Sequence, residues 1–229
     1  MAGKRCLVAC SMLETEIRHV MAELNSDIEI VWMDRGLHTE PEKLLLALQD
    51  EVDRLQDMDE ILLCYGLCGN GTNGLRSRTA TLVIPKFDDC INMLLCTGKR
   101  TARALVQKGV IYQSGGWAQF GGILHQYQEL KDNYGYDEET IADLMEMMYE
   151  NYTHLAFLDT GCADRSETLK HLNQAAKLLN LDMIEVQGSV RILEQLIKGE
   201  YNENFIILPP GHVLRYSDFE FCLPEKLVG

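Results

Sequence analysis

Short apolar runs alternate with longer segments of helical periodicity along the chain, and this alternation limits the fold more than any other feature. Runs rich in Val, Ile and Leu predict strands at 5–10, 28–33, 60–65, 80–85, 109–113, 154–159, 182–187 and 204–209. Strands that alternate with helices in this way are typical of βαβ units. We therefore expect an α/β protein with mostly parallel sheets flanked by helices, Rossmann-like in architecture.

Two of the intervening helices have readable starting points. The segment 41–56 opens with Pro41, and proline suits the first helical position because its missing N–H has no partner there in any case. Asp164 and Glu167 form a D-x-x-E capping pattern ahead of an apolar helical segment. We expect a helix to begin at each place.

The eight strands fall into two groups, separated by a longer helical segment. This spacing predicts an N-terminal α/β lobe over 1–115, a helical insertion over 116–152 and a C-terminal α/β lobe over 153–229, all within one compact unit. Two lobes favour a ligand cleft where they meet, and a single continuous sheet is the alternative arrangement. The methionines of the insertion are expected to pack in its core: Met145, Met147 and Met148.

Charge and apolar content exclude two classes of partner. The 229 residues carry 21 Lys and Arg against 35 Asp and Glu, a net charge of −14, which disfavours binding to the nucleic-acid backbone. No apolar stretch approaches the roughly 20 residues that span a bilayer, and Glu14 and Glu16 close the first apolar run before it reaches the length of an export signal. We expect a cytoplasmic protein.

A reducing compartment changes the expected use of the eight cysteines. Disulfides are rare there, so thiol chemistry, metal ligation or simple burial are the uses to weigh. Four cysteines lie in or after apolar segments and are predicted to be small core residues: Cys6, Cys64, Cys96 and Cys222.

The other cysteines follow predicted strands. In open α/β sheets, ligands bind beyond the carboxyl ends of the strands, so side chains that follow strands can converge at one edge. Cys10 ends the first strand. Cys90 follows Asp89, a residue suited to cap a helix, so its thiol is expected at a helix start, where the thiolate form is favoured. We predict a metal site from Cys68, Asp88, Cys90, Cys162 and His212, with Cys68 and Cys90 as catalytic residues.

Sulfur and imidazole ligands suit zinc, iron or an iron–sulfur centre. The spacing of the cysteines does not select among these, because the chain has C-x-x-x-C twice and lacks the paired C-x-x-C of a zinc ribbon.

The segment 62–74, "LLCYGLCGNGTNG", places Cys68 among four glycines. Its G-x-G-x-x-G substring starts too late in the chain for a dinucleotide-binding unit, and the segment after it is too short for the crossover helix. The glycines instead bring one sulfur and several amides close to a ligand. We predict cofactor or ligand contacts from Gly66, Gly69, Asn70, Gly71 and, in the insertion, Trp117.

Four short motifs resemble the family known as domain of unknown function 1638. They are "YGLCGNG" at 65–71, Pro85 with Asp89-Cys90, "GGW" at 115–117 and "DTG" at 159–161. The family usually has a histidine just before the Asp-Cys pair, where this chain has Asp88. The resemblance implies relatives in anaerobic bacteria and archaea, often encoded near corrinoid-dependent methyltransferase systems, and it implies no established reaction.

Three functions are compatible with these residues. The first is a metal-binding protein in corrinoid-linked methyl transfer, with zinc or an iron–sulfur centre and a small molecule or a corrinoid protein as partner. The second is a metal-independent enzyme of the racemase type, in which Cys68 and Cys162 act as an acid–base pair. The third is a non-enzymatic module that binds a corrinoid or a metal with aromatic side chains of the insertion: Trp117, Phe120, Tyr127, Tyr134 and Tyr136.

Overall fold

The computed structural model describes residues 3–97 and 107–219, and these residues form two compact units that each draw on separate parts of the chain. Unit 1 consists of residues 1–9, 28–90 and 195–229, and unit 2 consists of residues 10–27 and 91–194. These boundaries differ from the predicted ones at 115 and 152, because the chain passes between the units at residues 9–10, 27–28, 90–91 and 194–195.

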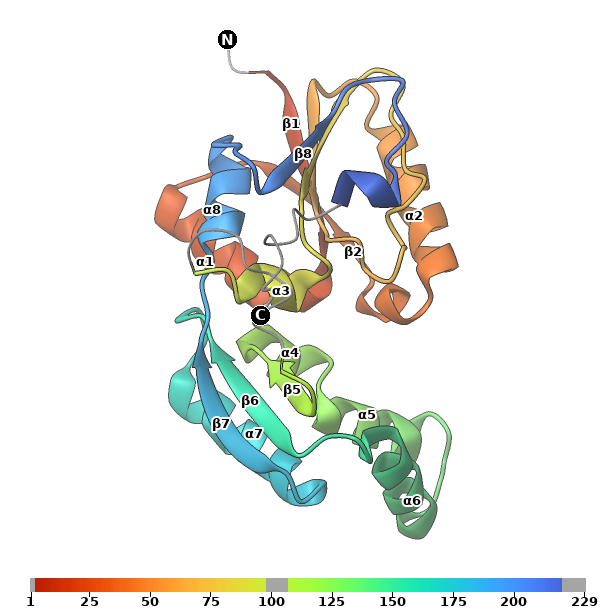
Figure 1. Cartoon of the computed structure of the whole chain (residues 1–229), viewed down its shortest axis with the longest axis vertical. Helices are drawn as coiled ribbons and strands as arrows, with labels where there is room; N and C mark the ends of the chain where they lie inside the picture. The colour runs from red at the N-terminus through yellow and green to blue at the C-terminus, as the bar shows by residue number, and fades with distance from the viewer. Residues whose placement is uncertain (1–2, 98–106, 220–229) are drawn as a thin grey trace, which may run out of the picture. The chain divides into compact units, whose positions relative to one another are not determined.

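Unit 1 is built on a five-stranded sheet in the order β2-β1-β3-β4-β8 (Figure 1). Its strands are β1 (Arg5–Cys10), β2 (Glu29–Met33), β3 (Glu60–Cys64), β4 (Thr81–Pro85) and β8 (Phe205–Leu208). β1 pairs with β3 and β3 with β4 in parallel, whereas β8 runs antiparallel to β4, with Pro85 opposite Phe205 and Leu82 opposite Leu208. The central strands are almost fully buried, as expected for a sheet covered on both faces.

Helices of different length accompany this sheet. α2 (Pro41–Arg54) starts at the predicted proline and buries Leu44, Leu48 and Val52, which share one helical face. The shorter elements are η2 (Arg35–Thr39), α3 (Cys90–Leu94), α8 (Arg191–Lys198) and η4 (Tyr216–Phe219), of which α3 and α8 extend across unit boundaries.

Unit 2 contains a three-stranded parallel sheet in the order β5-β6-β7. The strands are β5 (Val110–Gln113), β6 (His154–Asp159) and β7 (Asp182–Gln187). The helices are α1 (Glu14–Leu24), α4 (Gly115–Phe120), α5 (Ile123–Asp132), α6 (Glu138–Tyr149) and α7 (Arg165–Leu178). A short 3-10 helix, η1 (Ser11–Leu13), precedes α1. α7 packs along β6 and β7 (Figure 1), and the Asp164 side chain caps it by accepting from the Glu167 amide at 2.8 Å.

The core of unit 2 gathers apolar side chains from the sheet and four of its helices. Leu155 and Phe157 of β6 meet Ile141 and Met145 of α6, together with Leu172 of α7. The prediction that Met145 is a core residue is therefore confirmed. Met147 and Met148 are 65% and 50% exposed, so their predicted burial is wrong.

The α/β class, the mostly parallel sheets and all eight predicted strands are confirmed. The predicted division of the strands between the two lobes is wrong, because β8 completes the first sheet and β5 starts the second one. Cys6, Cys64 and Cys96 are buried as predicted, and Cys222 lies outside the described residues. Among the described helices, none combines the length and the apolar character that crossing a bilayer requires.

Candidate functional site

The loops that follow β3 and β4 pair with each other beyond the carboxyl edge of the unit 1 sheet. The Leu67 amide donates to the Phe87 carbonyl at 2.9 Å, and the Cys68 amide donates to the Asp88 carbonyl at 2.7 Å. A Cβ on Gly66 would lie 2.6 Å from the Phe87 carbonyl oxygen, so only glycine permits this approach. The "YGLCGNG" and "PKFDDC" segments are thus held side by side.

The backbone turns in the left-handed region at three successive residues of the first loop. The φ angles are +49° at Cys68, +64° at Gly69 and +75° at Asn70. This conformation costs a residue with a side chain roughly 1–2 kcal/mol, so the surrounding contacts must hold it. The buried Thr72 hydroxyl donates to the Gly66 carbonyl at 3.0 Å, and the Gly71 amide donates to the Cys68 carbonyl at 3.0 Å. Strain retained at a cysteine is a feature of functional loops.

A groove of about 620 Å³ lies beside this turn, opposite the first residues of α2. Gly69, Asn70 and Asn73 line one side, and Pro41 and its neighbours line the other. Four residues of this loop were predicted to contact a ligand: Gly66, Gly69, Asn70 and Gly71. Of these, Gly69 and Asn70 line the groove. Gly71 is buried with its missing Cβ directed at Leu44 of α2, so it serves packing, as Gly66 does.

Cys68 and Cys90 are both half-buried on the paired loops. Cys90 is the first residue of α3, two residues beyond the carbonyl that accepts from Cys68. Asp88, whose carbonyl makes this contact, and Asp89, which precedes Cys90, are half-buried as well. The structure therefore brings the loop of Cys68 and the loop of Asp88 and Cys90 together, as the reasoning from strand ends predicts.

His212 lies at the other end of the unit 1 sheet, and its predicted place in the site is wrong. Because β8 runs antiparallel to β4, the residues after β8 lie beside the amino end of β4. The Gly211 amide donates to the Ser77 carbonyl at 2.7 Å, and Val213 pairs with Arg76, both ahead of β4. The imidazole of His212 is exposed there.

The predicted metal ligands do not form a closed set. Within residues 3–97 and 107–219, no three His, Cys, Asp or Glu side chains are grouped as the ligands of one ion. A structural zinc site needs four protein ligands, so the described residues do not fit such a site.

In unit 2, the "GGW" motif meets the loop that continues from "DTG" at a carboxyl sheet edge. A Cβ on Gly115 would lie 2.3 Å from the Cβ of Ala163, so the start of α4 and the loop after β6 are in direct contact. Trp117 is half-buried in α4. In each unit, a glycine of one motif thus leaves no space for a side chain beside a neighbouring strand-end loop.

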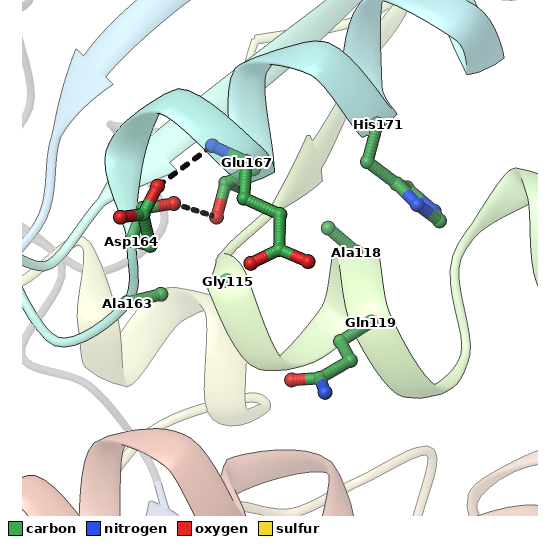
Figure 2. A pocket seen from close by; sticks show the side chains of 8 residues that line it. Gly115, Ala118, Gln119, Ala163, Asp164, Glu167 and His171 are labelled. Atoms are coloured by element: carbon green, nitrogen blue, oxygen red, sulfur yellow. Dashed lines mark hydrogen bonds between the residues drawn. The ribbon is translucent and has the colours of Figure 1, made fainter.

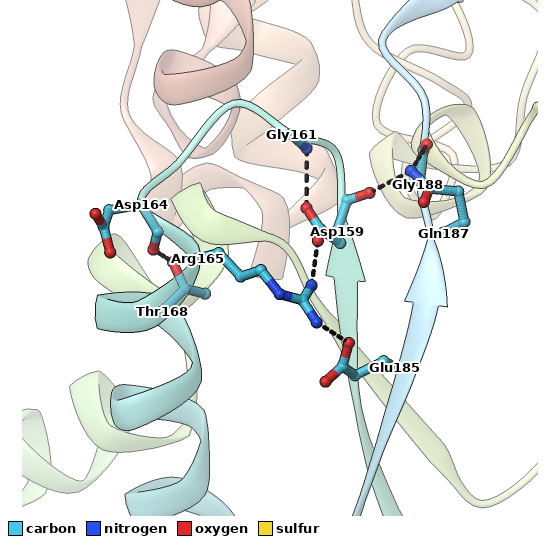
Figure 3. Close-up of polar contacts among 8 residues, drawn as sticks. All are labelled: Asp159, Gly161, Asp164, Arg165, Thr168, Glu185, Gln187 and Gly188. Carbon is cyan, nitrogen blue, oxygen red and sulfur yellow. Dashed lines mark hydrogen bonds and ion pairs between the residues drawn. The ribbon is translucent and has the colours of Figure 1, made fainter.

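Asp159 of the "DTG" motif organises the turn after β6 (Figure 3). Its carboxylate accepts from the Gly161 amide at 3.0 Å and pairs with Arg165, which also pairs with Glu185. The Gly188 amide donates to the Asp159 carbonyl at 2.8 Å. These contacts tie the ends of β6 and β7 to the start of α7, a structural role for Asp159.

Cys162 follows this turn and is a poor candidate for a thiolate. Burial raises the pKa of its thiol to about 11, and the charges of Glu16, Asp159 and Glu194 add to the shift. The thiol donates to the Thr160 carbonyl at 3.5 Å, a hydrogen bond that only the protonated thiol can make. At neutral pH Cys162 is therefore a protonated thiol.

A pocket of about 210 Å³ lies between α4 and the first turns of α7 (Figure 2). Glu167 and His171 lie one turn apart on α7, and Gln119 of α4 faces them across the pocket. Burial lowers the pKa of His171, opposed in part by the charge of Glu167, so the imidazole is neutral at pH 7. The volume is below that of common ligand pockets, so it suits a molecule of only a few atoms.

Glu16 of α1 is a buried carboxyl that reasoning from strand ends missed. It is fully buried, and its carboxyl lies against Ser114 and the Gly116 backbone at the start of α4. Burial raises its pKa, and Ser114 and the Gly116 amide lower it in part. Neither carboxyl oxygen makes a hydrogen bond of normal geometry with any described residue. The neutral acid is therefore the form that the fold stabilises.

The raised pKa of Glu16 predicts a stability that declines with pH. Between the ordinary pKa of Glu and the higher folded pKa, the native state keeps a proton that the unfolded chain has lost. The free energy of unfolding then falls as pH rises, by up to about 1.4 kcal/mol per pH unit from this group. Glu16→Gln is expected to flatten this slope in denaturant titrations between pH 4 and 8. Glu14→Gln, which removes the half-exposed partner of Arg18 on the same helix, is the control and should keep the slope. An unchanged slope in Glu16→Gln would contradict the assignment.

The fold and its paired strand-end loops define an α/β protein with a thiol-bearing loop at one sheet edge. A family model described as "Protein of unknown function (DUF1638)" matches residues 32–197, more than half of the chain, so the chain belongs to this family. The matched range includes all four motifs that carry the resemblance. No curated protein and no solved structure matches the chain.

Proposed function

We propose that the chain is a thiol-dependent enzyme that binds a small polar molecule in the groove beside the left-handed turn and acts on it with Cys68. The observation that carries the proposal is the backbone of Cys68, which stays in a conformation unfavourable for a cysteine while its amide is bonded to the neighbouring loop. The next two residues, Gly69 and Asn70, line the groove.

Comparison of the described cysteines supports the choice of Cys68. Cys6, Cys10, Cys64 and Cys96 are buried in or next to strands and helices of the core, which keeps a substrate away from their sulfurs. Cys162 has a thiol pKa of about 11. Cys68 and Cys90 remain, on the two paired loops and half-exposed to solvent. Cys90 is the group best placed to assist Cys68 as a second thiol.

Reaction with iodoacetamide tests this proposal, because alkylation depends on thiolate character and access. At pH 7.5, peptide mass spectrometry is expected to find carbamidomethyl first on Cys68. Cys162 should react about a hundredfold more slowly than free cysteine, since its pKa of about 11 leaves little thiolate. Cys68→Ser should remove the fast phase, and the matched variant Cys162→Ser should keep it. If Cys68 reacts no faster than the buried cysteines, the proposal fails.

A metal-centred form of the site is the second candidate, since two soft ligands, Cys68 and Cys90, lie on paired loops. Zinc or iron held by these two thiolates needs further ligands from a bound molecule, such as a corrinoid, or from a partner protein. Metal analysis of protein purified without oxygen separates the two candidates. About one metal ion per chain that is lost in both Cys68→Ser and Cys90→Ser supports the metal; its absence from the wild type supports the metal-independent enzyme.

A further inference from the structure

A second cavity, of about 510 Å³, lies in unit 2 among α5, the end of α6 and the end of α7. Its polar lining consists largely of two kinds of side chain, three tyrosines and three glutamates: Tyr127, Tyr149, Tyr152, Glu138, Glu146 and Glu150. Among the described residues, no lysine, arginine or histidine lines it. Met145, Leu178 and Leu179 form an apolar wall. The cavity uses no residue of the thiol site.

Two of the tyrosines form an aromatic corner. The ring centroids of Tyr149 and Tyr152 are 6.0 Å apart and the rings are tilted by 59°, so the two rings are in contact without stacking. The Tyr149 hydroxyl donates to the Gln126 side chain, which fixes this ring, and burial raises its pKa to about 12. Tyr149 therefore remains a neutral ring whose electron-rich face attracts cations.

The carboxylates leave the cavity with negative charge. Glu138 accepts from the Tyr127 hydroxyl and is paired with Lys131 at 2.6 Å, so its charge is largely balanced. Glu146 and Glu150 have no cationic side chain within 4 Å among the described residues. Anionic ligands are therefore disfavoured in this cavity, and the net charge of −14 attracts cations to the chain in general.

The kind of cation follows from the geometry of the lining. A divalent metal ion needs several oxygens converging on one point, and the described residues contain no such group of three. A primary ammonium is strongly hydrated, whereas a methylated ammonium is weakly hydrated and gains most from aromatic faces. The volume is within the range of small-molecule pockets.

We propose that this cavity binds a small organic cation through a methylated ammonium group, with the Tyr149–Tyr152 corner facing the methyl groups and Glu146 and Glu150 supplying the opposite charge. The site is independent of the thiol site, and either one can fail alone.

The test compares choline with 3,3-dimethylbutan-1-ol, which has the same shape with carbon in place of the charged nitrogen. Titrations by calorimetry and by protein NMR use the full chain in about 0.15 M sodium chloride, so that general attraction to the negative surface is screened. Choline is expected to bind, and the neutral alcohol is expected to bind at least about tenfold more weakly.

Matched variants locate the binding. Tyr152→Leu and Glu146→Gln change groups at the solvent-exposed side of the cavity, Tyr152 being 40% exposed, and each should weaken choline binding by roughly tenfold. Tyr134→Leu and Glu139→Gln alter exposed residues of the same unit outside the cavity. These two variants should leave the affinity for choline unchanged. Equal affinity for choline and its neutral analogue, no binding at all, or equal effects of both pairs of variants would overturn the proposal.

Discussion

Gly66→Ala is expected to lower the free energy of unfolding by about 3 kcal/mol, the upper end of the usual cost of overpacking. The added Cβ would lie 2.6 Å from the Phe87 carbonyl oxygen and 2.8 Å from the Asp89 amide nitrogen. Both are backbone atoms, which cannot turn aside as the end of a flexible side chain can. Relief requires that the two loops move apart, and the Cys68 amide then loses its bond to Asp88. Urea unfolding measures the loss of stability, and the alkylation rate of Cys68 measures the loss of the site.

The control for Gly66→Ala is Gly211→Ala in the same unit. Gly211 has φ of +81° and no atom within 4 Å of its missing Cβ, so alanine there meets backbone strain without a clash. A cost of roughly 1–2 kcal/mol and an unchanged alkylation rate of Cys68 are expected. Equal costs in the two variants would mean that the loops are not held by the close approach at Gly66.

Gly115→Ala, in unit 2, is expected to lower the free energy of unfolding by about as much as Gly66→Ala does. The steric clash that causes this loss can be removed by a second substitution. The new methyl group would lie 2.3 Å from the Cβ of Ala163, far inside contact distance. Ala163→Gly deletes that atom, so the double variant Gly115→Ala/Ala163→Gly moves the methyl group from the loop after β6 to the start of α4. We expect it to recover most of the loss, apart from the roughly 0.5–1 kcal/mol that glycine costs through its backbone freedom.

Thermal and urea unfolding of the wild type, both single variants and the double variant complete the cycle. The interaction energy between the two positions should be large and favourable, because residues in contact are not additive. Additive effects would show that "GGW" and the loop after "DTG" are not in contact. A single variant that is too unstable to purify still leaves the double variant as a positive test.

The sequence predicted the local elements well because their signals are local. Apolar runs of strand length gave all eight strands, Pro41 marked the start of α2, and the Asp164 cap marked the start of α7. The loops of Cys68 and Cys90 could also be paired from the sequence, since consecutive parallel strands end at the same sheet edge.

The direction of β8 could not be predicted in the same way. An apolar run of this length is equally compatible with parallel and antiparallel pairing, and the reversal moves His212 to the opposite end of the sheet. The assignment of β5 and β8 to their sheets has the same origin, because the choice of neighbouring strand depends on long-range packing.

Glu16 was overlooked because a glutamate on a helix is normally assigned to solvent. A signal was present: Glu16 follows Leu13 by three residues and precedes Val20 by four, which places it on the apolar face of its helix. The exposed Tyr134 and Tyr136 stack on each other at 5.9 Å between their ring centroids. Nothing in their spacing distinguished them from the half-buried aromatic residues of the same insertion, such as Trp117 and Tyr149.

The pairing of β4 with β8 has a consequence for synthesis on the ribosome. β4 emerges early, but the strand that covers its edge is made only after residues 91–194, the larger part of unit 2. Unit 2 is complete at residue 194, whereas the sheet of unit 1 retains an open β4 edge until the last strand emerges. An open edge can pair with another nascent chain, so the period before residue 208 is made is when this protein is most exposed to misassembly.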